Sequence, residues 1–533
     1  MPIPGNMGRD NSFMSPEAPP ADTMHGDLSG IESRDLDRLS DRIEDQEWRL
    51  DNLYYIINEE GKRVLFRMRN VQRKLFRGRW WRNIIVKARQ LGYTSFIDIF
   101  GLDLAIFNRN VRGGIVAHTR QDAQIIFRDK IKYAYENLPA QVRNRVQARK
   151  CDAGELLLAN NSSIRVGTGF RSATAQFLHV SEYAKICAKY PQKAKEILTG
   201  SIPAVHKGGF VFIEGTAEGR SGSFFDIAED SRKFAGTHRP LTELSFKFWF
   251  TPWWVDPKYT LPPSGIVIPA RLRTYFSDLE KRHRITLSKP QQAWYATVER
   301  IYGEDMLREY PSTPDEAFKS SVHGAYYKAQ LYKAYQDGRV TDLPIEKGYK
   351  IHTAWDIGHG DSTAIWFYQV IGNWIHVVDY YENCGEPLGH YVDVLCEKAY
   401  DYGNFYGPHD LLAHDWGTGH TAAETALTDY GIAFLVAPNI SLSDGIERTR
   451  TLLSRCVFDE ERCSRDLGKQ PVGLTSLESY HHEWDEDNGM WKSTPFHDWA
   501  SHGADSFRYL ALTVGQEGAG LTVANSVDRW VAR

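Results

Sequence analysis

The 533-residue sequence lacks features that would assign it to several specialised classes of protein. None of its six cysteines forms a C-x-x-C pair, so a zinc ribbon or dithiol redox motif is not expected, and so few cysteines indicate a reducing compartment. No apolar run is long enough to span a bilayer, and the N-terminal segment has no apolar stretch after a basic start, as a secretory signal would have. We therefore expect a soluble, intracellular protein.

The sequence also lacks an excess of basic residues. It has 64 Lys and Arg against 68 Asp and Glu, a net charge of −4, whereas dedicated nucleic-acid-binding proteins are often basic overall. Hydrophobic residues at 42% and charged residues at 25% are typical of a soluble globular protein and exclude collagen-like, coiled-coil and wholly disordered chains. At roughly 100–200 residues per domain, the length predicts more than one domain.

The basic residues that are present gather in one segment. Residues 61–97 contain many Lys and Arg and no Asp or Glu up to residue 97, and Trp80 and Trp81 lie inside this basic run. An unbroken positive segment beside aromatic residues is typical of phosphate binding. The alternative is a solvated helix face.

The first part of the sequence predicts an α/β domain behind a flexible tail. Residues 1–31 are rich in Pro, Gly and Ser, which predicts the tail, and residues 32–60 have the apolar spacing of a surface helix. Short β-branched runs then alternate with helix-like or polar segments, which is typical of a mostly parallel sheet flanked by helices. These predicted strands are 84–86, 114–118, 177–180 and 210–215. The Trp- and Pro-rich segment 247–262 is predicted to be a loop.

A polar stretch within 311–349 predicts a domain boundary, with a linker at 326–349. Beyond it, strand-like runs joined by Gly and Asp turns predict an antiparallel meander, followed by a mixture of helices and strands. The predicted strands are 349–358, 362–370, 373–382 and 410–417, and the predicted helices are 388–400 and 500–513. A loop at 484–497 precedes the last helix, and 514–533 is predicted to be a polar tail.

A strand at 82–86 runs through a short loop into an apolar helix, which is the place where backbone N–H groups and the helix dipole hold phosphate. Aligned on Gly92, the pattern G-x-x-x-x-G-K-[ST] has Lys87 at its first Gly, Tyr93 at its Lys and Thr94 at its hydroxyl position. The strict pattern therefore fails, and either Lys87 or Arg89 has to supply the missing phosphate-facing charge. The alternative is an ordinary strand-to-helix turn.

Two later strands end in residues that suit nucleotide hydrolysis. Ser181 and Glu182 directly follow an apolar strand, where a nucleotide hydrolase needs carboxylate to help hold Mg²⁺ and to polarise water. Ser181 stands in the place of the usual Asp, so Glu182 is the candidate catalytic base; the alternative is an acidic cap on the next helix. Thr216, in EGTAEG, would lie beside the γ-phosphate.

Acidic residues recur at strand ends and on the last helix of the second domain. They are Asp356, Asp361, Asp415 and Asp505. Carboxylates converging from separate elements suit Mg²⁺ or Mn²⁺, and two such ions about 4 Å apart can cleave a phosphodiester. For any single Asp the alternative is a turn or cap residue, most of all for Asp361.

In their order along about residues 60–515, these motifs resemble the large terminase subunit of tailed bacteriophages, the motor that packages DNA. The resemblance is carried by RNVQRKLFRGRWWRNIIVKARQLGYTS, FLHVSEYAK, EGTAEG, EYPSTPDEAF and HGADSFRY. It implies a P-loop ATPase domain of the ASCE type at 32–325, with a mostly parallel sheet, and an RNase H-like α/β nuclease domain at 350–513.

The resemblance also implies roles for individual residues. It implies that Gln72 lies near adenine and that Glu182 is catalytic in the ATPase. It places around the phosphates Lys87, Arg89, Gln90, Gly92, Thr94, Ser95 and Thr216, with Thr94 on the metal. It makes Asp356, Asp415 and Asp505 the catalytic triad of the nuclease. Asp361 is a candidate metal ligand from its position in the sequence alone. Tyr93 and Ser181 depart from the family pattern, and the arginine finger stays open between Arg109, Arg112 and Arg120.

The implied activity is ATP-driven translocation of double-stranded DNA into a prohead, with endonucleolytic cutting at the start and end of packaging. The implied cofactors are ATP with Mg²⁺ and two Mg²⁺ or Mn²⁺ ions in the nuclease. The implied partners are DNA, a small terminase subunit and the portal protein, on which the chain would form a homo-oligomeric ring in the host cytoplasm, away from any membrane.

Three other functions explain less of the sequence. A helicase-nuclease of repair or defence should carry further helicase motifs after residue 182, and none is found. A transposase-type enzyme would leave residues 80–219 unexplained. A non-enzymatic DNA-binding particle protein would explain the basic run but not the ordered carboxylates.

Overall fold

The computed structural model describes residues 42–515, apart from 168, 171–173, 221, 238, 320–323, 359–361, 414–420, 468–469 and 486–489. The predicted N-terminal tail and almost all of the predicted C-terminal tail lie outside these residues. The chain divides into a first unit, Met1–Arg49, and a second unit, Leu50–Arg533, which carries both large sheets. Within the described part, no helix is long and apolar enough to cross a membrane. All six cysteines are free thiols.

The helix predicted at 32–60 ends at Asn52, so the prediction is wrong for the residues after it. Helix α2 spans Gln46–Asn52, and Tyr55–Ile57 then form strand β1, which pairs antiparallel with β2, Arg63–Leu65. The segment Tyr-Ile-Ile is aromatic and β-branched, which favours a strand once a partner strand is present. Residues 32–41 lie outside the described part.

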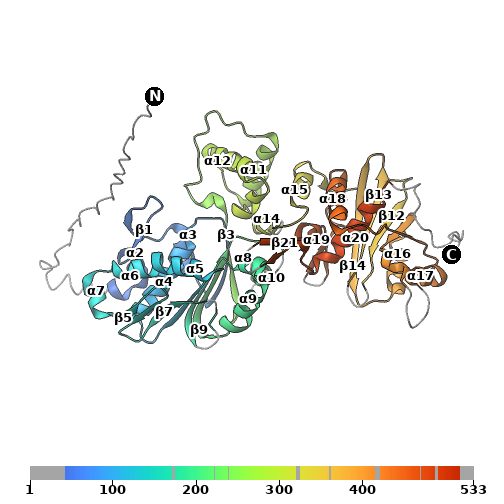
Figure 1. Ribbon diagram of the computed structural model, residues 1–533. Helices are drawn as coiled ribbons and strands as arrows, with labels where there is room; N and C mark the ends of the chain where they lie inside the picture. The colour runs from blue at the N-terminus through green and yellow to red at the C-terminus, as the bar shows by residue number, and fades with distance from the viewer. Residues whose placement is uncertain are drawn as a thin grey trace, which may run out of the picture. The chain divides into compact units, whose positions relative to one another are not determined.

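The first large sheet has the strand order β10-β3-β9-β8-β4-β7-β6-β5. Figure 1 labels its strands β3, β5, β7 and β9. Its strands are β3 (Arg82–Lys87), β4 (Arg112–Val116), β5 (Ala148–Cys151), β6 (Glu155–Leu158), β7 (Ser163–Val166), β8 (Ala175–Ser181), β9 (Val205–Gly215) and β10 (Phe246–Thr251). All neighbours from β10 to β7 are parallel, and β6 pairs antiparallel with both β5 and β7. The mostly parallel sheet is therefore confirmed, and the insertion of β9 between β3 and β8 is the strand order of the predicted ASCE type.

Helices cover both faces of this sheet, and alternation along the strands assigns residues to each face. On one face, Phe177 and Phe212 pack against Phe100 of α4, Tyr93–Phe107. On the other, Leu178 and Val180 belong to a core shared with α8 (Tyr183–Lys189) and α10 (Gly222–Ala235). The remaining helices of this half are α3 (Asn70–Gly78), α5 (Arg120–Ile126), α6 (Tyr133–Glu136), α7 (Ala140–Arg145), α9 (Pro191–Glu196), α11 (Ala270–His283), α12 (Lys289–Tyr302), α13 (Met306–Glu309) and α14 (Pro314–Lys319).

The loop predicted at 247–262 is partly wrong, because it contains most of β10. This strand is aromatic at alternate positions and adds to the sheet edge in parallel with β3. The Pro residues that suggested a loop come after it. Trp253, in the following 3₁₀ turn, is fully buried, stacks on Trp294 and donates its Nε1–H to Ser312 Oγ at 2.9 Å.

The second large sheet has the order β11-β17-β14-β13-β12-β15-β16. Its strands are β11 (Val340–Thr341), β12 (Ile351–Asp356), β13 (Ser362–Ile371), β14 (Trp374–Cys384), β15 (Tyr402–Gly407), β16 (Phe434–Val436) and β17 (Cys456–Asp459). The predicted antiparallel meander is confirmed as β12, β13 and β14, and β15 then lies parallel beside β12. The run β14-β13-β12-β15-β16 is the strand order of an RNase H-like fold, as expected.

Helices pack around this sheet, and two predictions need correction. The helices are α15 (Lys328–Gln336), α16 (Leu388–Lys398), α17 (Ala422–Tyr430), α18 (Leu442–Leu453), α19 (Leu474–Ser479) and α20 (Ala500–Thr513), with small hairpins β18–β19 (Ser464–Leu467, Gln470–Gly473) and β20–β21 (His482–Asp485, Met490–Pro495). The strand predicted at 410–417 is wrong in its described part, because β15 ends at Gly407 and His409–Leu412 form a 3₁₀ turn; residues 414–417 lie outside the described residues. The loop predicted at 484–497 contains most of the β20–β21 hairpin, which Trp484 and Trp491 stabilise as an edge-to-face pair.

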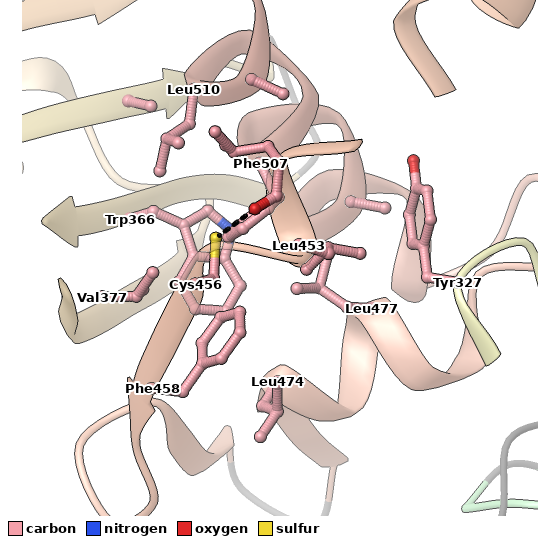
Figure 2. Close-up of a cluster of buried hydrophobic side chains, with 14 of the residues drawn as sticks. Tyr327, Trp366, Val377, Leu453, Cys456, Phe458, Leu474, Leu477, Phe507 and Leu510 are labelled. Atoms are coloured by element: carbon pink, nitrogen blue, oxygen red, sulfur yellow. Dashed lines mark hydrogen bonds between the residues drawn. The ribbon is translucent and has the colours of Figure 1, made fainter. Parts of the chain in front are cut away.

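The core beneath α20 contains the fully buried Trp366, which packs edge-to-face on Phe507 (Figure 2). Its Nε1–H donates to the Gly503 carbonyl at 2.8 Å. We expect Trp366→Ala to lower the free energy of unfolding by about 3–5 kcal/mol, since it leaves a large cavity and removes a buried hydrogen bond. Trp374→Ala is the matched control, because that ring is 46% exposed and its loss should cost less than about 0.5 kcal/mol. Denaturant unfolding of both variants measures the difference, and equal losses would contradict this packing.

Candidate nucleotide and metal sites

The loop between β3 and α4 is held in a tight turn. Gly92, at the N-cap of α4, has φ 77°, and Gln90 also lies in the left-handed region at φ 54°. Gln72 Nε2 donates to the Gly92 carbonyl at 2.7 Å, and a Cβ added to Gly92 would lie 2.7 Å from the same nitrogen. Lys258 Nζ donates to the Gln90 carbonyl at 2.8 Å. The fold thus brings Gln72 to the loop, and its contact with adenine stays a prediction.

Lys87, the last residue of β3, lies at the centre of this site. Its Nζ is 3.0 Å from Glu214 Oε2 and 3.4 Å from Glu182 Oε1, and its side chain is 7% exposed. Burial alone would lower the pKa of Lys87, but the carboxylates of Glu214 and Glu182 outweigh burial and raise that pKa above its ordinary value. Arg89 instead points to Glu309, with Nε 3.3 Å from Oε2, and is about half exposed. Of the two candidate cations, Lys87 is therefore the one beside Glu182.

The first turn of α4 supplies a hydroxyl to the same place. Thr94 Oγ1 donates to Glu214 Oε1 at 2.8 Å. Tyr93, which occupies the usual Lys position, is buried and shares a 2.6 Å hydrogen bond with Thr251 Oγ1, so it does not fill the role of that lysine. Ser95 follows in the same turn and is half-buried.

Glu182 has strained backbone geometry. It follows β8 at φ 52° and ψ 45°, in the left-handed region that a non-glycine residue rarely adopts. Its side chain makes no capping hydrogen bond to α8, which argues against the alternative of an acidic helix cap. Non-glycine residues held in this region cluster at active sites, because the surrounding structure must compensate for their strain. The carboxylate is about one-third exposed and faces Lys87.

Glu214, on β9, is the residue of this site that the sequence patterns missed. It is fully buried and directly opposite Ser181 in the β8–β9 register. Ser181 Oγ donates to Glu214 Oε1 at 2.8 Å, the same oxygen that Thr94 contacts. An acid inside the apolar run FVFIEG was the signal that could have found it, because a buried carboxylate needs partners. Thr216 lies just beyond the end of β9 and is also buried.

Asp98 and His179 form a buried acid–imidazole pair next to Glu214. His179 Nδ1 lies 2.7 Å from Asp98 Oδ1 of α4, and His179 Nε2 lies 3.5 Å from Glu214 Oε1. Burial would lower the pKa of His179, but Asp98 and Glu214 outweigh it and raise the pKa to about 9. Burial would raise the pKa of Glu214, but Lys87 and His179 lower it well below its ordinary value. Both shifts favour the charged forms of Glu214 and His179.

The second site lies at the end of β12 and on α20. Asp356 Oδ2 is 3.4 Å from His502 Nδ1, and Asp505 Oδ1 is 3.0 Å from Arg508 of the same helix. Burial raises the pKa of Asp505, Arg508 opposes that shift, and the negative charge of Asp356 adds to it. The two carboxylates are thus within electrostatic reach of each other. Asp361 and Asp415 lie outside the described residues.

Glu382 is a further carboxylate on this sheet that sequence reasoning missed. The register places Asp356 opposite Ala364 and Ala364 opposite Glu382, so the acids of β12 and β14 share a face across one small residue. Burial raises the pKa of Glu382, and Asp356 adds to the shift. Within the part of the chain that the structure describes, no three acidic, His or Cys side chains gather closely enough for one metal ion.

Several cations of the basic run are partnered by acids from other segments. Arg69 Nη1 lies 3.0 Å from Asp256 Oδ2, and Arg73 Nη2 lies 2.7 Å from Asp51 Oδ2. With Lys87 and Arg89 also paired, part of this positive charge is neutralised inside the domain. The basic side chains that remain exposed on and before α3 include Arg67, Lys74 and Arg77.

Comparison with solved structures finds several similar bacteriophage proteins. Over most of its length, the chain is similar to bacteriophage large terminases. The HK97 large terminase is 11% identical with a TM-score of 0.38, covering 89% of this chain and 99% of its own. The large terminase of a thermophilic bacteriophage is 13% identical with a TM-score of 0.30, covering 84% of this chain and 99% of its own.

A third similar structure is the nuclease domain of the SPP1 large terminase with bound Mn, at 17% identity and a TM-score of 0.23. It covers 30% of this chain and 84% of its own. No family profile and no curated protein matches the sequence.

Proposed function

We propose that this chain is a DNA-packaging motor subunit that hydrolyses ATP to translocate double-stranded DNA and cuts that DNA with a metal-dependent nuclease. The observation that carries the proposal is the position of Lys87 between Glu182 and Glu214, at a strand–loop–helix junction that also presents Thr94. A cation, a hydroxyl and a partly exposed carboxylate at such a junction are what phosphoryl transfer to water requires.

In the proposed ATPase, backbone N–H groups of the loop and of the first turn of α4 hold the phosphates, and Lys87 neutralises their charge. Glu182 orients the attacking water, with its carboxylate held at the exposed edge of the site. The oxygen donors of Thr94 and Ser181 suit Mg²⁺, which when bound would neutralise charge on the phosphates. Thr216 follows β9 directly and would pass the change at the γ-phosphate to the rest of the domain.

In the proposed nuclease, Asp356 and Asp505 are carboxylate ligands, joined by Asp415 and Asp361. Carboxylate oxygens suit Mg²⁺ or Mn²⁺, and a pair of such ions would activate water and stabilise the leaving oxygen in phosphodiester cleavage. His502 lies against Asp356 and Arg508 against Asp505, so both acids have a partner that fixes their orientation.

The packaging role itself rests on the order of motifs in the sequence and on the pairing of an ASCE-type sheet with an RNase H-like sheet. The proposed partners are a small terminase subunit that recruits DNA and a portal protein on which a ring of these chains assembles. A paired assay tests the proposal: ATP turnover and Mn²⁺-dependent plasmid cleavage should both be present in the purified chain with DNA. Absence of both activities would contradict it.

DNA affinity should depend steeply on salt if exposed basic residues bind phosphates. We expect the dissociation constant for a labelled duplex to rise about 10-fold or more between roughly 50 and 200 mM salt, because counterions are released on binding. Substituting Arg67, Lys74 and Arg77 by Gln should flatten that slope, since each phosphate contact contributes about one unit of it. Fluorescence anisotropy measures both, and a slope unchanged by the triple substitution would mean that DNA binds elsewhere.

A further inference from the structure

The proposed ATPase site has no Asp at the end of β8, and a carboxylate on the neighbouring strand β9 lies beside that position. In P-loop ATPases an Asp at the end of the strand before the catalytic Glu helps to hold Mg²⁺, together with the hydroxyl of the loop. Here that position is Ser181, which has no charge. The carboxylate nearest to it is Glu214, directly across the β8–β9 register.

The contacts of Glu214 are those that the missing Asp would make. Its Oε1 accepts hydrogen bonds from Thr94 Oγ1 and from Ser181 Oγ, both at 2.8 Å. Glu214 is thus hydrogen-bonded to the hydroxyl that would face a bound metal and to the side chain that occupies the Asp position. Its longer side chain spans the distance between the two strands.

We propose that Glu214 has replaced the strand-end aspartate as the carboxylate that holds the Mg²⁺ of bound ATP, with Ser181 as its hydrogen-bonding support. This inference rests on the proposed ATP binding at the site. The donors fit the ion, since Mg²⁺ is held by carboxylate and hydroxyl oxygens together with substrate phosphates.

The surroundings keep this carboxylate in place without nucleotide. Lys87 Nζ lies 3.0 Å from Glu214 Oε2, and His179 lies on the opposite side, backed by Asp98. With ATP bound, Lys87 would pair with the phosphates, which would release Glu214 Oε2 from its ion pair with Lys87. Exchange of Lys87 between Glu214 and the phosphates would therefore couple nucleotide binding to metal binding.

The competing interpretation is that Glu214 is only a buried counter-ion for Lys87. The two roles differ in what Mg²⁺ does. A metal-holding carboxylate increases ATP affinity only when Mg²⁺ is present, whereas a structural counter-ion affects stability and affinity equally with and without the metal.

The test is the dissociation constant of a fluorescent ATP analogue for the full chain, in excess Mg²⁺ and in EDTA, together with the melting temperature. For Glu214→Gln we expect the tightening by Mg²⁺ to fall by at least about 10-fold, because losing a carboxylate that holds the ion should cost no less than losing a group that only orients a metal ligand. Binding in EDTA should persist. In the double variant Ser181→Asp/Glu214→Gln, the carboxylate returns to β8 and the Mg²⁺ response should recover.

Asp103→Asn is the matched control. Like Glu214→Gln, it neutralises a fully buried carboxylate, in this case on α4. The Asn side chain keeps an oxygen that can accept the 2.7 Å hydrogen bond from Tyr54. Its Mg²⁺ response should equal that of the wild type. An unchanged Mg²⁺ response in Glu214→Gln would overturn the inference, as would equal affinity losses in Mg²⁺ and EDTA with a lowered melting temperature. If the wild type itself binds no ATP analogue, the proposed function fails instead.

Discussion

Replacing Glu182 by Gln is expected to reduce ATP turnover by about 10²–10⁴-fold, because the amide cannot accept a proton from the attacking water. Nucleotide binding should persist, since Lys87 and the loop are untouched and Lys87 keeps Glu214 as a partner. Plasmid cleavage by the second domain should also persist. Phosphate release and equilibrium binding of an ATP analogue measure the two effects separately.

The control for this substitution is Glu299→Gln on α12. Glu299 forms a two-bond pair with Arg271 at 2.7 and 2.6 Å, and it belongs to neither site. Turnover by this variant should match the wild type. Wild-type turnover in Glu182→Gln would remove Glu182 from the role of catalytic base.

Replacing Asp356 by Ala should abolish Mn²⁺-dependent cutting of plasmid DNA, with a fall of at least about 100-fold. The expected loss exceeds the usual 10–100-fold effect of groups that merely orient a ligand, because Asp356 is proposed to contact the metal itself. ATP turnover should stay at the wild-type level, since Asp356 belongs to the nuclease sheet and its ion-pair partner is His502. Conversion of supercoiled to linear plasmid on a gel measures the first effect.

Asp401→Ala provides the comparison, because Asp401 is 70% exposed and pairs with Lys350 on the surface of the same domain. Cleavage by that variant should be unchanged. If Asp356→Ala still degrades plasmid, the nuclease centre must lie elsewhere on the sheet.

Strands with a continuous apolar run in the sequence were predictable. The strands β3, β4, β8 and β9 contain short apolar runs that are buried between helices, and such runs are visible in the sequence. The same holds for the meander of the second domain. β15 was missed because Gly403, Asn404 and Gly407 interrupt its aromatic residues, and its strand identity comes from pairing with β12 and β16.

Some residues of the candidate sites were likewise predictable from the sequence, and others were not. Lys87, Thr94 and Glu182 were predicted because each lies at a fixed offset from a strand end. Glu214 was missed because the pattern expects its carboxylate on β8, and only the register between β8 and β9 brings it opposite Ser181. Pairing across strands is long-range information that a linear motif does not contain.

The segment between the two sheets affects how the nuclease half can be studied alone. Tyr327 and Leu331 pack into the core with Trp366, and β11 pairs with β17. A fragment cut at residue 350, where the strand-rich sequence begins, would leave that apolar surface bare and expose the edge of β17. Such edges recruit other chains. An excised nuclease should therefore begin upstream of Tyr326, so that it keeps its own cover and stays monodisperse.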